Sequence, residues 1–265
     1  MRRIGIAGCG RAARPFLDHL RKAGVAASGY GAALGPDTGE TAAETFAAGI
    51  DTLILLPRDI AEAEALLFEN EAFAKTAPDL CRIVISATLS PRYVRALRGR
   101  IAARITLIDA PFAGGARAIS DARVSFFLGG PVEDLRHMAP IFDHLGRQAI
   151  RMGGFGTAMA AKVMNDFLAA SSNAMTRIAL DWAEAQGIDE ARMIEMTGDT
   201  FAQTPAAFAQ EIIEFMQPGS GGEFSVSTLI KDVECALDTA LTSAHLTPPG
   251  AFETLFGSMK SRAIH

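Results

Sequence analysis

Short apolar runs alternate with helical patterns throughout the first half of the chain, and this alternation is the feature that most narrows the fold. Two of the runs, Thr52–Leu56 and Arg82–Ser86, are apolar enough to be strands buried on both faces. The strands predicted in this way are Arg3–Gly8, Val25–Tyr30, Thr52–Leu56, Arg82–Ser86, Arg104–Ile108 and Arg123–Leu128, and the helices are Arg11–Ala23, Ile60–Phe68, Pro91–Ala103 and Pro131–Leu145. Alternating strand and helix units predict a mostly parallel sheet with helices on both of its faces.

The pattern changes near Met152. Three glycines precede Thr157, which can cap a helix that runs to about Gln186. Only helical patterns follow, and they cover Glu190–Thr200, Pro205–Met216, Ser227–Ser243 and Pro249–Ser261. We therefore predict two domains joined by a long helix. Residues 1–152 form a doubly wound α/β domain, and residues 153–265 form an all-helical domain for substrate binding and dimerisation.

A glycine-rich turn connects the first strand to the first helix. It has the form G-x-G-x-x-A and consists of Gly8, Cys9, Gly10, Arg11, Ala12 and Ala13. The first glycine permits the tight turn, the second lets a pyrophosphate approach the backbone, and the small third residue lets the helix pack on the strand. The N-terminus of the helix then faces the anion. The competing interpretation is a tight turn that binds no ligand. The position of the motif after the first strand favours dinucleotide binding and a Rossmann-type sheet.

The choice between NAD and NADP rests on weaker observations. Dinucleotide folds place an acid for the ribose of NAD, or an arginine for the 2′-phosphate of NADP, about 20 residues after the turn. Ser28–Ala33 contains neither. Residues 1–151 carry a net charge of +3, which suits a phosphate-bearing ligand, whereas residues 152–265 carry −8, which disfavours nucleic acid as a partner. Both cofactors stay open, and NADP is slightly favoured.

Two further clusters carry groups that suit a small acid substrate. Asp109–Gly115 follows a predicted strand, where ligands bind in open α/β sheets, and the backbone N–H groups of its glycines could hold a carboxylate. In the helix after Thr157, Lys162, Asn165 and Asp166 share one face. Lys162 has apolar neighbours, and a desolvated lysine has a lowered pKa that suits a general acid or base. The competing interpretation of Asp109–Gly115 is a turn between domains. The competing interpretation of Lys162 is a surface lysine paired with Asp166.

Other classes of protein are disfavoured by what the sequence lacks. No apolar stretch approaches the roughly 18 residues of a membrane span, and the first apolar segment is too short for a signal peptide. The three cysteines are odd in number and far apart, which fits a reduced cytoplasmic protein and excludes a disulfide scaffold. The five histidines have no paired ligand spacing, so no metal site is expected.

In this order the clusters resemble the β-hydroxyacid dehydrogenase family, which includes 3-hydroxyisobutyrate dehydrogenase and 6-phosphogluconate dehydrogenase. The resemblance spans nearly the whole chain and begins with the strand and turn of Gly5–Ala13. The other matching segments are Leu55-Leu56-Pro57 for the family's Leu-Pro segment, Ala87–Pro91 with Thr88 for its Ser-Thr-x-x-Pro segment, Asp109–Gly115 for its substrate signature, Gly154–Asp166 for its lysine helix and Lys231-Asp232 for its Lys-Asp pair near the nicotinamide. Without the resemblance, an exposed helix face is the commoner interpretation of the stretch around this last pair.

The resemblance implies a role for each group of residues. Lys162 would be the catalytic residue that exchanges the hydroxyl proton of the substrate. The cofactor would contact Gly8, Cys9, Gly10, Arg11, Ala12, Ala13, Leu55, Leu56, Pro57, Thr88 and Lys231, and the substrate would contact Ala113, Gly114, Gly115, Asn165 and Asp166. The chain also departs from the family, because Ala113 replaces its substrate-binding serine, Asp166 its second asparagine, and Ala118 and Ala122 two usual glycines.

Together these observations predict an NAD(P)-dependent oxidoreductase that transfers a hydride between the cofactor and a small β-hydroxy acid or its semialdehyde. A reductase of another carbonyl or of an imine stays open because Ala113 lacks a hydroxyl, and so does a non-catalytic dinucleotide-binding module on the same fold. The long helix is expected to expose an apolar stripe, which predicts a homodimer or a larger homo-oligomer. Residues that could form part of the stripe are Leu168, Met175, Ile178 and Trp182.

Overall fold

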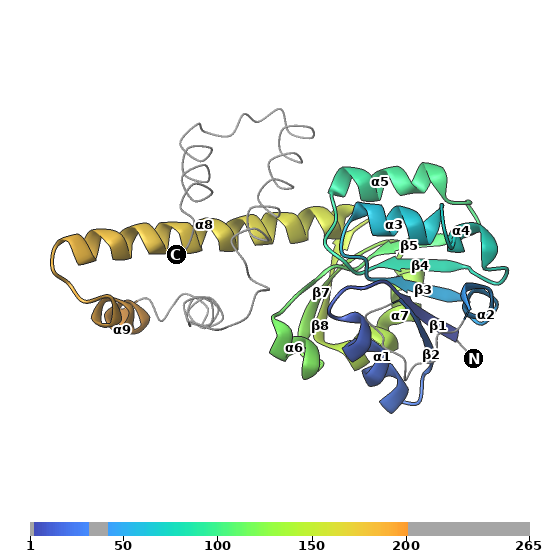
Figure 1. Cartoon of the computed structure of the whole chain (residues 1–265), viewed down its shortest axis with the longest axis horizontal. Coiled ribbons are helices and arrows are strands. Elements are labelled where there is room, and N and C mark those ends of the chain that lie inside the picture. The colour runs from blue at the N-terminus through green and yellow to red at the C-terminus, as the bar shows by residue number, and fades with distance from the viewer. Residues whose placement is uncertain (1–2, 32–41, 201–265) are drawn as a thin grey trace. The chain divides into compact units, whose positions relative to one another are not determined.

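The computed structural model describes residues 3–31 and 42–200 (Figure 1). The strands are β1 (Arg3–Ala7), β2 (Ala26–Tyr30), β3 (Thr52–Leu55), β4 (Arg82–Ile85), β5 (Thr106–Asp109), β6 (Phe112–Ala113), β7 (Val124–Gly129) and β8 (Gly146–Gly153). The helices are α1 (Ala13–Lys22), α2 (Ala43–Ala48), α3 (Ile60–Leu67), α4 (Phe73–Thr76), α5 (Pro91–Arg100), α6 (Ala116–Ser120), α7 (Val132–Leu145), α8 (Thr157–Ala185) and α9 (Glu190–Thr200). The three helices predicted after residue 204, and the segment with Lys231, lie outside the described residues.

The strands of the described residues form one sheet in the order β2-β1-β3-β4-β5-β7-β6, and β8 pairs with β7. Strands β1 to β5 are parallel, with Ile4–Ala7 of β1 in register with Thr52–Leu55 of β3. Strand β7 is antiparallel to β5 and β6, and β8 is parallel to β7. The predicted doubly wound, mostly parallel sheet is therefore confirmed. Because β2 and β3 flank β1 on opposite sides, the strand order reverses between β1 and β3.

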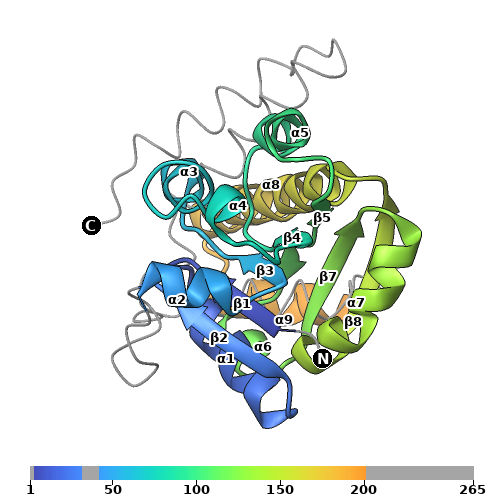
Figure 2. The ribbon, with the colours of Figure 1, turned by 90° about the vertical axis from the view of Figure 1, so that its right-hand side faces the viewer.

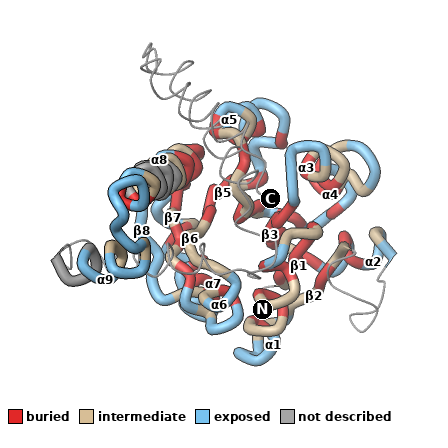
Figure 3. The backbone as a smooth tube through the Cα atoms, turned by 60° about the vertical axis from the view of Figure 1, so that its left-hand side comes forward, coloured by how far each residue is buried: buried red, intermediate tan, exposed pale blue. Residues whose placement is uncertain are grey.

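Two layers of helices cover the sheet, and each encloses its own apolar core (Figures 1 and 2). Helices α1, α6 and α7 pack on one face, and α2 to α5 pack on the other. Alternate residues of each central strand point to opposite faces. Ile54 of β3 joins the first core, whereas Leu53 and Leu55 join the second. Strand β3 is buried at every residue, and β1, β4 and β5 are buried after their first residue (Figure 3), as the apolar runs predict.

The differences from the predicted elements are local. Strand β8 was not predicted because its exposed edge position lets polar residues such as Arg147, Gln148 and Arg151 interrupt any apolar run. Helix α5 ends at Arg100 rather than at Ala103. The guanidinium of Arg98 donates to the carbonyl oxygens of Ile101, Ala102 and Ile105, which stabilises the turn that follows. The short elements α2, α4, α6 and β6 carry too few residues to show a periodic pattern.

The first compact unit of the structure is Met1–Lys162, and a second unit begins at Val163. The predicted boundary between residues 152 and 153 lies earlier, before the long helix. The first unit extends into α8, where Asp109 of β5 and the N–H of Leu89 after β4 bind the start of that helix. Helices α8 and α9 have the bounds that the sequence predicts, to within one residue.

Candidate active site

The glycine turn after β1 lies directly against the end of β3. Gly8 has a φ of +123°, and a Cβ atom there would overlap the carbonyl group of Leu56. A Cβ atom at Gly10 would lie 2.6 Å from the same oxygen, which instead accepts the N–H of Gly10 at 2.9 Å. Both glycines are therefore required by close approach of two backbones. This tight cradle is what a dinucleotide needs in order to reach the backbone of the turn.

Helix α1 begins immediately after this turn and presents its N-terminus. Ala12 and Ala13 are buried, and Ala13 packs the helix on the sheet as the small third residue of the motif. No side chain caps the N-terminus of α1, and its first turn contains no acidic residue. Orphan N–H groups and the positive end of the helix dipole favour an anion at such a position. The residues of the turn therefore fit the pyrophosphate of a dinucleotide.

The other predicted cofactor residues lie at the same edge of the sheet, because parallel strands end together. Leu56 and Pro57 follow β3, and Thr88, which is partly exposed, follows β4. Leu55 and Leu56 are buried in the two cores, so they contribute main-chain atoms to this edge rather than side chains. At this edge the strand order reverses between β1 and β3, which is the kind of place where ligands bind in open α/β sheets. Lys231, predicted to contact the cofactor, lies outside the described residues.

Asp109, the last residue of β5, connects this edge to the long helix. Its side chain is completely buried, and its two oxygens accept the N–H groups of Gly156 and Met159, each at 2.7 Å. Burial raises the pKa of the Asp109 carboxyl, and the two hydrogen bonds oppose that shift. Gly129 lies across from it on β7, where any Cβ atom would overlap the carboxylate. Asp109 therefore fixes the N-terminus of α8 to the end of the sheet.

Lys162 follows in the next turn of α8. This residue is only 8% exposed, and Ala158, Met159 and Val163 beside it are buried. The N–H of Leu89, next to Thr88, donates to the sulfur of Met159 at 3.3 Å, which ties the segment after β4 to the same turn of the helix. The structure thus confirms the burial that the apolar sequence around Lys162 predicts.

Asn165 and Asp166 lie at the third and fourth positions after Lys162 in the same helix, and both are partly exposed. This spacing places all three side chains on one face of α8.

The predicted substrate loop begins at Asp109 itself. Ala113 ends β6, opposite Ser125 of β7, and Ala113, Gly114 and Gly115 are all partly exposed. Gly114 has a φ of +145°, a conformation that favours glycine. One end of the loop is thus anchored by the same side chain that holds the lysine helix. Ala122 further along has a φ of +53°, where the resemblance places a glycine.

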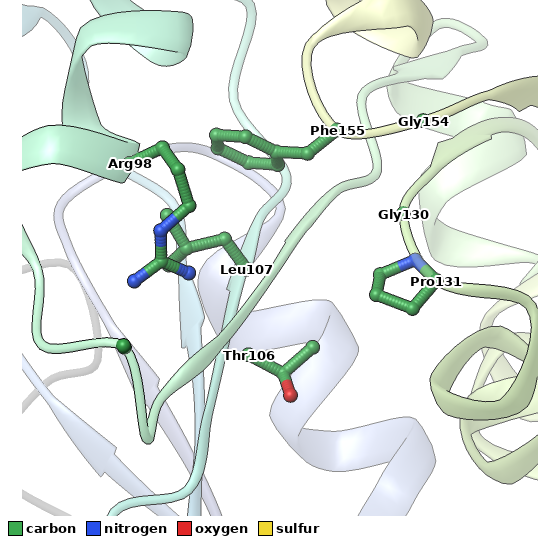
Figure 4. Close-up of a pocket in the computed structure, with 8 residues that line it drawn as sticks. Arg98, Thr106, Leu107, Gly130, Pro131, Gly154 and Phe155 are labelled. Carbon is green, nitrogen blue, oxygen red and sulfur yellow. The ribbon is translucent and has the colours of Figure 1, made fainter.

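A hollow of about 420 Å³ lies beside β5. Figure 4 shows Arg98 and Phe155 on one side of it and Pro131 on the other. The guanidinium of Arg98 is hydrogen-bonded to three main-chain carbonyls. Within the described part of the chain, none of the predicted site residues lines this hollow, but Gly130 and Phe155 in its lining are next to Gly129, which pairs with Asp109, and Gly156, which donates to it.

Sequence reasoning missed two acids of the site, Asp109 as a helix anchor and Glu62 beside the glycine turn. Glu62 accepts the N–H of Cys9 at 2.7 Å and the N–H of Arg58 at 2.8 Å. Asp109 stands in the substrate signature, but only the fold shows that it reaches α8. Nothing in the sequence indicates that Glu62 contacts the glycine turn, because the pattern of its helix is that of an ordinary amphipathic surface helix.

Within residues 3–31 and 42–200, no group of three His, Cys, Asp or Glu side chains is arranged to hold a metal ion. The helices of the described residues include none that is both long and apolar enough to cross a membrane.

Comparison with known families gives two adjacent matches that together cover most of the chain. Residues 3–154 match the model of the NAD binding domain of 6-phosphogluconate dehydrogenase. Residues 156–260 match the NAD-binding model of NADP-dependent 3-hydroxyisobutyrate dehydrogenase.

Individual proteins agree with these models. A 3-hydroxyisobutyrate dehydrogenase from Pseudomonas aeruginosa is 28% identical over 188 residues, which is 68% of this chain and 63% of that protein. An NAD-dependent L-serine dehydrogenase from the same organism is 26% identical over 268 residues, covering 95% of this chain and 89% of the relative. The structure of Mycobacterium tuberculosis 3-hydroxyisobutyrate dehydrogenase with L-serine superposes with a TM-score of 0.80 at 20% identity, covering 99% of this chain and 94% of that one. This last likeness shows the shared fold.

Proposed function

The chain belongs to the β-hydroxyacid dehydrogenase family of NAD(P)-dependent enzymes, and we propose that it transfers a hydride between the cofactor and a small β-hydroxy acid or its semialdehyde. The observation that carries this proposal is the pair of 2.7 Å hydrogen bonds from α8 to Asp109. Asp109 begins the loop that would hold the acid group, and its buried side chain also binds the start of the helix that carries Lys162.

The dinucleotide would lie along the carboxyl edge of the sheet. The turn from Gly8 to Ala13 would hold its pyrophosphate at the N-terminus of α1. The backbone of Leu55, Leu56 and Pro57, together with Thr88, would line this edge, and Lys231 is proposed to join them. The nicotinamide, when bound, supplies or takes up the hydride.

Lys162 is proposed as the catalytic residue that moves the proton. In reduction its Nζ would donate a proton to the carbonyl oxygen, and in oxidation it would accept the proton of the hydroxyl group. Only 8% of Lys162 is exposed, which limits the contact of its side chain with solvent. Asn165 and Asp166 share its helix face and would orient the amine and the substrate oxygen.

The carboxylate of the substrate is proposed to bind the backbone N–H groups of Gly114 and Gly115 beside Ala113. Turnover with a panel of β-hydroxy acids, their semialdehydes and uncharged carbonyl compounds tests the assignment. Activity with a β-hydroxy acid supports it, and activity confined to uncharged compounds contradicts it.

One observation favours a second candidate, the reduction of another carbonyl or of an imine. Ala113 offers no hydroxyl where the family places a serine, so the site has one hydrogen-bond donor fewer for an acid group. The same panel, extended with imines, separates the two candidates.

Replacing Ala113 with serine is expected to lower the Michaelis constant for small β-hydroxy acids by about tenfold, since a hydrogen bond to a charged group contributes about 1.5–3 kcal/mol. The carboxylate is charged in both the ground and the transition state, so the turnover number should change less. Steady-state kinetics of Ala113→Ser are compared with those of Ala116→Ser, which adds a hydroxyl to exposed α6 and should change neither constant. An unchanged Michaelis constant in Ala113→Ser would mean that this loop does not hold the acid group.

We also propose that the chain acts in the cytoplasm as a homodimer or larger homo-oligomer. Leu168 and Trp182 of α8 are 63% and 72% exposed, and exposed large apolar side chains on one helix favour burial by a partner. Light scattering at micromolar concentration is expected to give at least twice the 28.0 kDa of one chain. A mass of one chain would contradict the proposal.

A further inference from the structure

A chain of hydrogen bonds joins the glycine turn after β1 to the start of α3. One oxygen of Glu62 accepts the N–H of Cys9 at 2.7 Å. The other accepts the N–H of Arg58 at 2.8 Å and its Nε–H at 3.2 Å. The side chain of Glu62 is 13% exposed, whereas that of Arg58 is 68% exposed. A carboxylate is thus fixed to the backbone of the turn, with an arginine fixed to the carboxylate.

This carboxylate is ionised near neutral pH. Burial raises the pKa of the Glu62 carboxyl, but the hydrogen bonds from Arg58 and Cys9 outweigh burial and hold that pKa below its ordinary value.

The partner of Glu62, Cys9, follows Gly8, which contacts the end of β2. The N–H of Gly8 donates to the carbonyl oxygen of Tyr30 at 3.0 Å, and a Cβ atom at Gly31 would lie 2.9 Å from the oxygen of Gly8. The end of β2 is where dinucleotide folds place the acid or arginine that distinguishes NAD from NADP. Ser28–Ala33 supplies neither group. Glu62, bound to the residue next to Gly8, brings an acid to this place from α3.

The sequence around β2 and β3 is poor in cations. The sequence contains no lysine or arginine between Lys22 and Arg58. Arg58 is the first cation after that gap, and its guanidinium is paired with Glu62 through the Nε–H. The 2′-phosphate of NADP carries negative charge that needs a cation, and it would meet an arginine already paired with an ionised carboxylate. Arg11 lies in the turn itself and is a second cation that a 2′-phosphate could meet, so it is tested separately.

We propose that Glu62 is a specificity-determining residue that makes the chain bind NAD(H) more tightly than NADP(H). Its carboxylate repels the 2′-phosphate and keeps Arg58 engaged. The inference rests on the proposed function, in which the glycine turn binds a dinucleotide. It reverses the slight preference for NADP that the sequence suggests, because that preference assumed that no acid stands near the end of β2.

The experiment measures the dissociation constants of NADH and NADPH by fluorescence titration. The wild type is expected to bind NADH at least about tenfold more tightly, the scale of one charged contact. Glu62→Gln keeps an oxygen for the N–H of Cys9 and removes both the negative charge and the ion pair with Arg58. In this variant the dissociation constant of NADPH should fall by about tenfold, whereas that of NADH should change by less than about threefold.

Three variants show whether the gain depends on Arg58. Arg58→Met in the Glu62→Gln background should abolish the gain in NADPH binding, whereas Arg11→Met in that background should leave it. Glu64→Gln is the matched control, because Glu64 lies in the same helix but binds Arg100, and it should shift neither dissociation constant.

Three outcomes overturn the proposal while leaving the proposed function in place: tighter binding of NADPH by the wild type, weaker binding of both cofactors by Glu62→Gln, and a gain lost with Arg11→Met instead of Arg58→Met. The second outcome would mean that Glu62 only supports the turn. If the folded wild type binds neither cofactor, the proposed function itself fails. Thermal shifts with each cofactor give a second readout, and the wild-type preference tests the proposal even if Glu62→Gln does not fold.

Discussion

Replacing Lys162 with methionine is expected to lower the turnover number by about 10² or more, the usual scale for the loss of a general acid or base. Binding of the dinucleotide should persist, because the glycine turn and the ends of β1 and β3 contain no part of Lys162. Methionine has nearly the same length and an apolar stem, so it fits the buried position of a residue that is 8% exposed. The loss should therefore appear in turnover and not in cofactor affinity or folding.

Steady-state kinetics and fluorescence titration of NADH and NADPH measure the two effects separately. Lys162→Arg should also lose most of the activity, because a planar guanidinium that stays protonated cannot accept the proton as a compact amine does. Lys22→Met is the matched control, since Lys22 is exposed in the last turn of α1, and it should retain full activity. Near-normal turnover of Lys162→Met would assign Lys162 a structural role and remove the catalytic residue from the proposed mechanism.

The sequence predicts well those parts of the fold in which a local physical requirement, such as burial of a strand or close approach of two backbones, demands one type of residue. The runs Thr52–Leu56 and Arg82–Ser86 carry apolar residues on both of their faces, and the structure buries both faces of β3 and β4. The turn from Gly8 to Ala13 needs glycine because a neighbouring backbone approaches within hydrogen-bond distance. Such requirements are local, so the sequence carries them directly.

What the sequence does not show depends on contacts between distant segments. Asp109 lies 47 positions from Gly156, and Glu62 lies 53 from Cys9. Nothing in their immediate neighbours indicates these partners, because an acid that accepts backbone N–H groups has no fixed sequence spacing from them. Strand β8 was missed for a related reason. It is an edge strand that pairs with the distant strand β7, and its own residues are mostly exposed, so no apolar pattern marks it.

Replacing Gly8 with alanine is expected to destabilise the protein by about 3 kcal/mol, because it adds strain in a glycine-only backbone conformation to overpacking of a filled space. The φ of +123° is unsuited to a side chain, and the new Cβ atom would overlap the carbonyl of Leu56 and lie 2.9 Å from the nitrogen of Pro57. Main-chain atoms cannot rotate away as a flexible side chain can. The turn and the end of β3 must therefore separate, and the edge that the dinucleotide would occupy changes shape.

The same replacement should weaken binding of NADH and NADPH by at least about tenfold, which corresponds to about 1.4 kcal/mol of lost contact with the backbone of the turn. Gly99→Ala provides the matched control, because Gly99 is exposed in α5, has an ordinary φ and has nothing within 4 Å of a new Cβ atom. Alanine there should raise the stability by about 0.5–1 kcal/mol through its better helix propensity and leave both dissociation constants unchanged. Thermal unfolding and fluorescence titration of the two variants test the pair. If Gly8→Ala is destabilised but binds both dinucleotides as the wild type does, the glycine serves only the packing of β1 on β3, and the cofactor must bind elsewhere along the carboxyl edge.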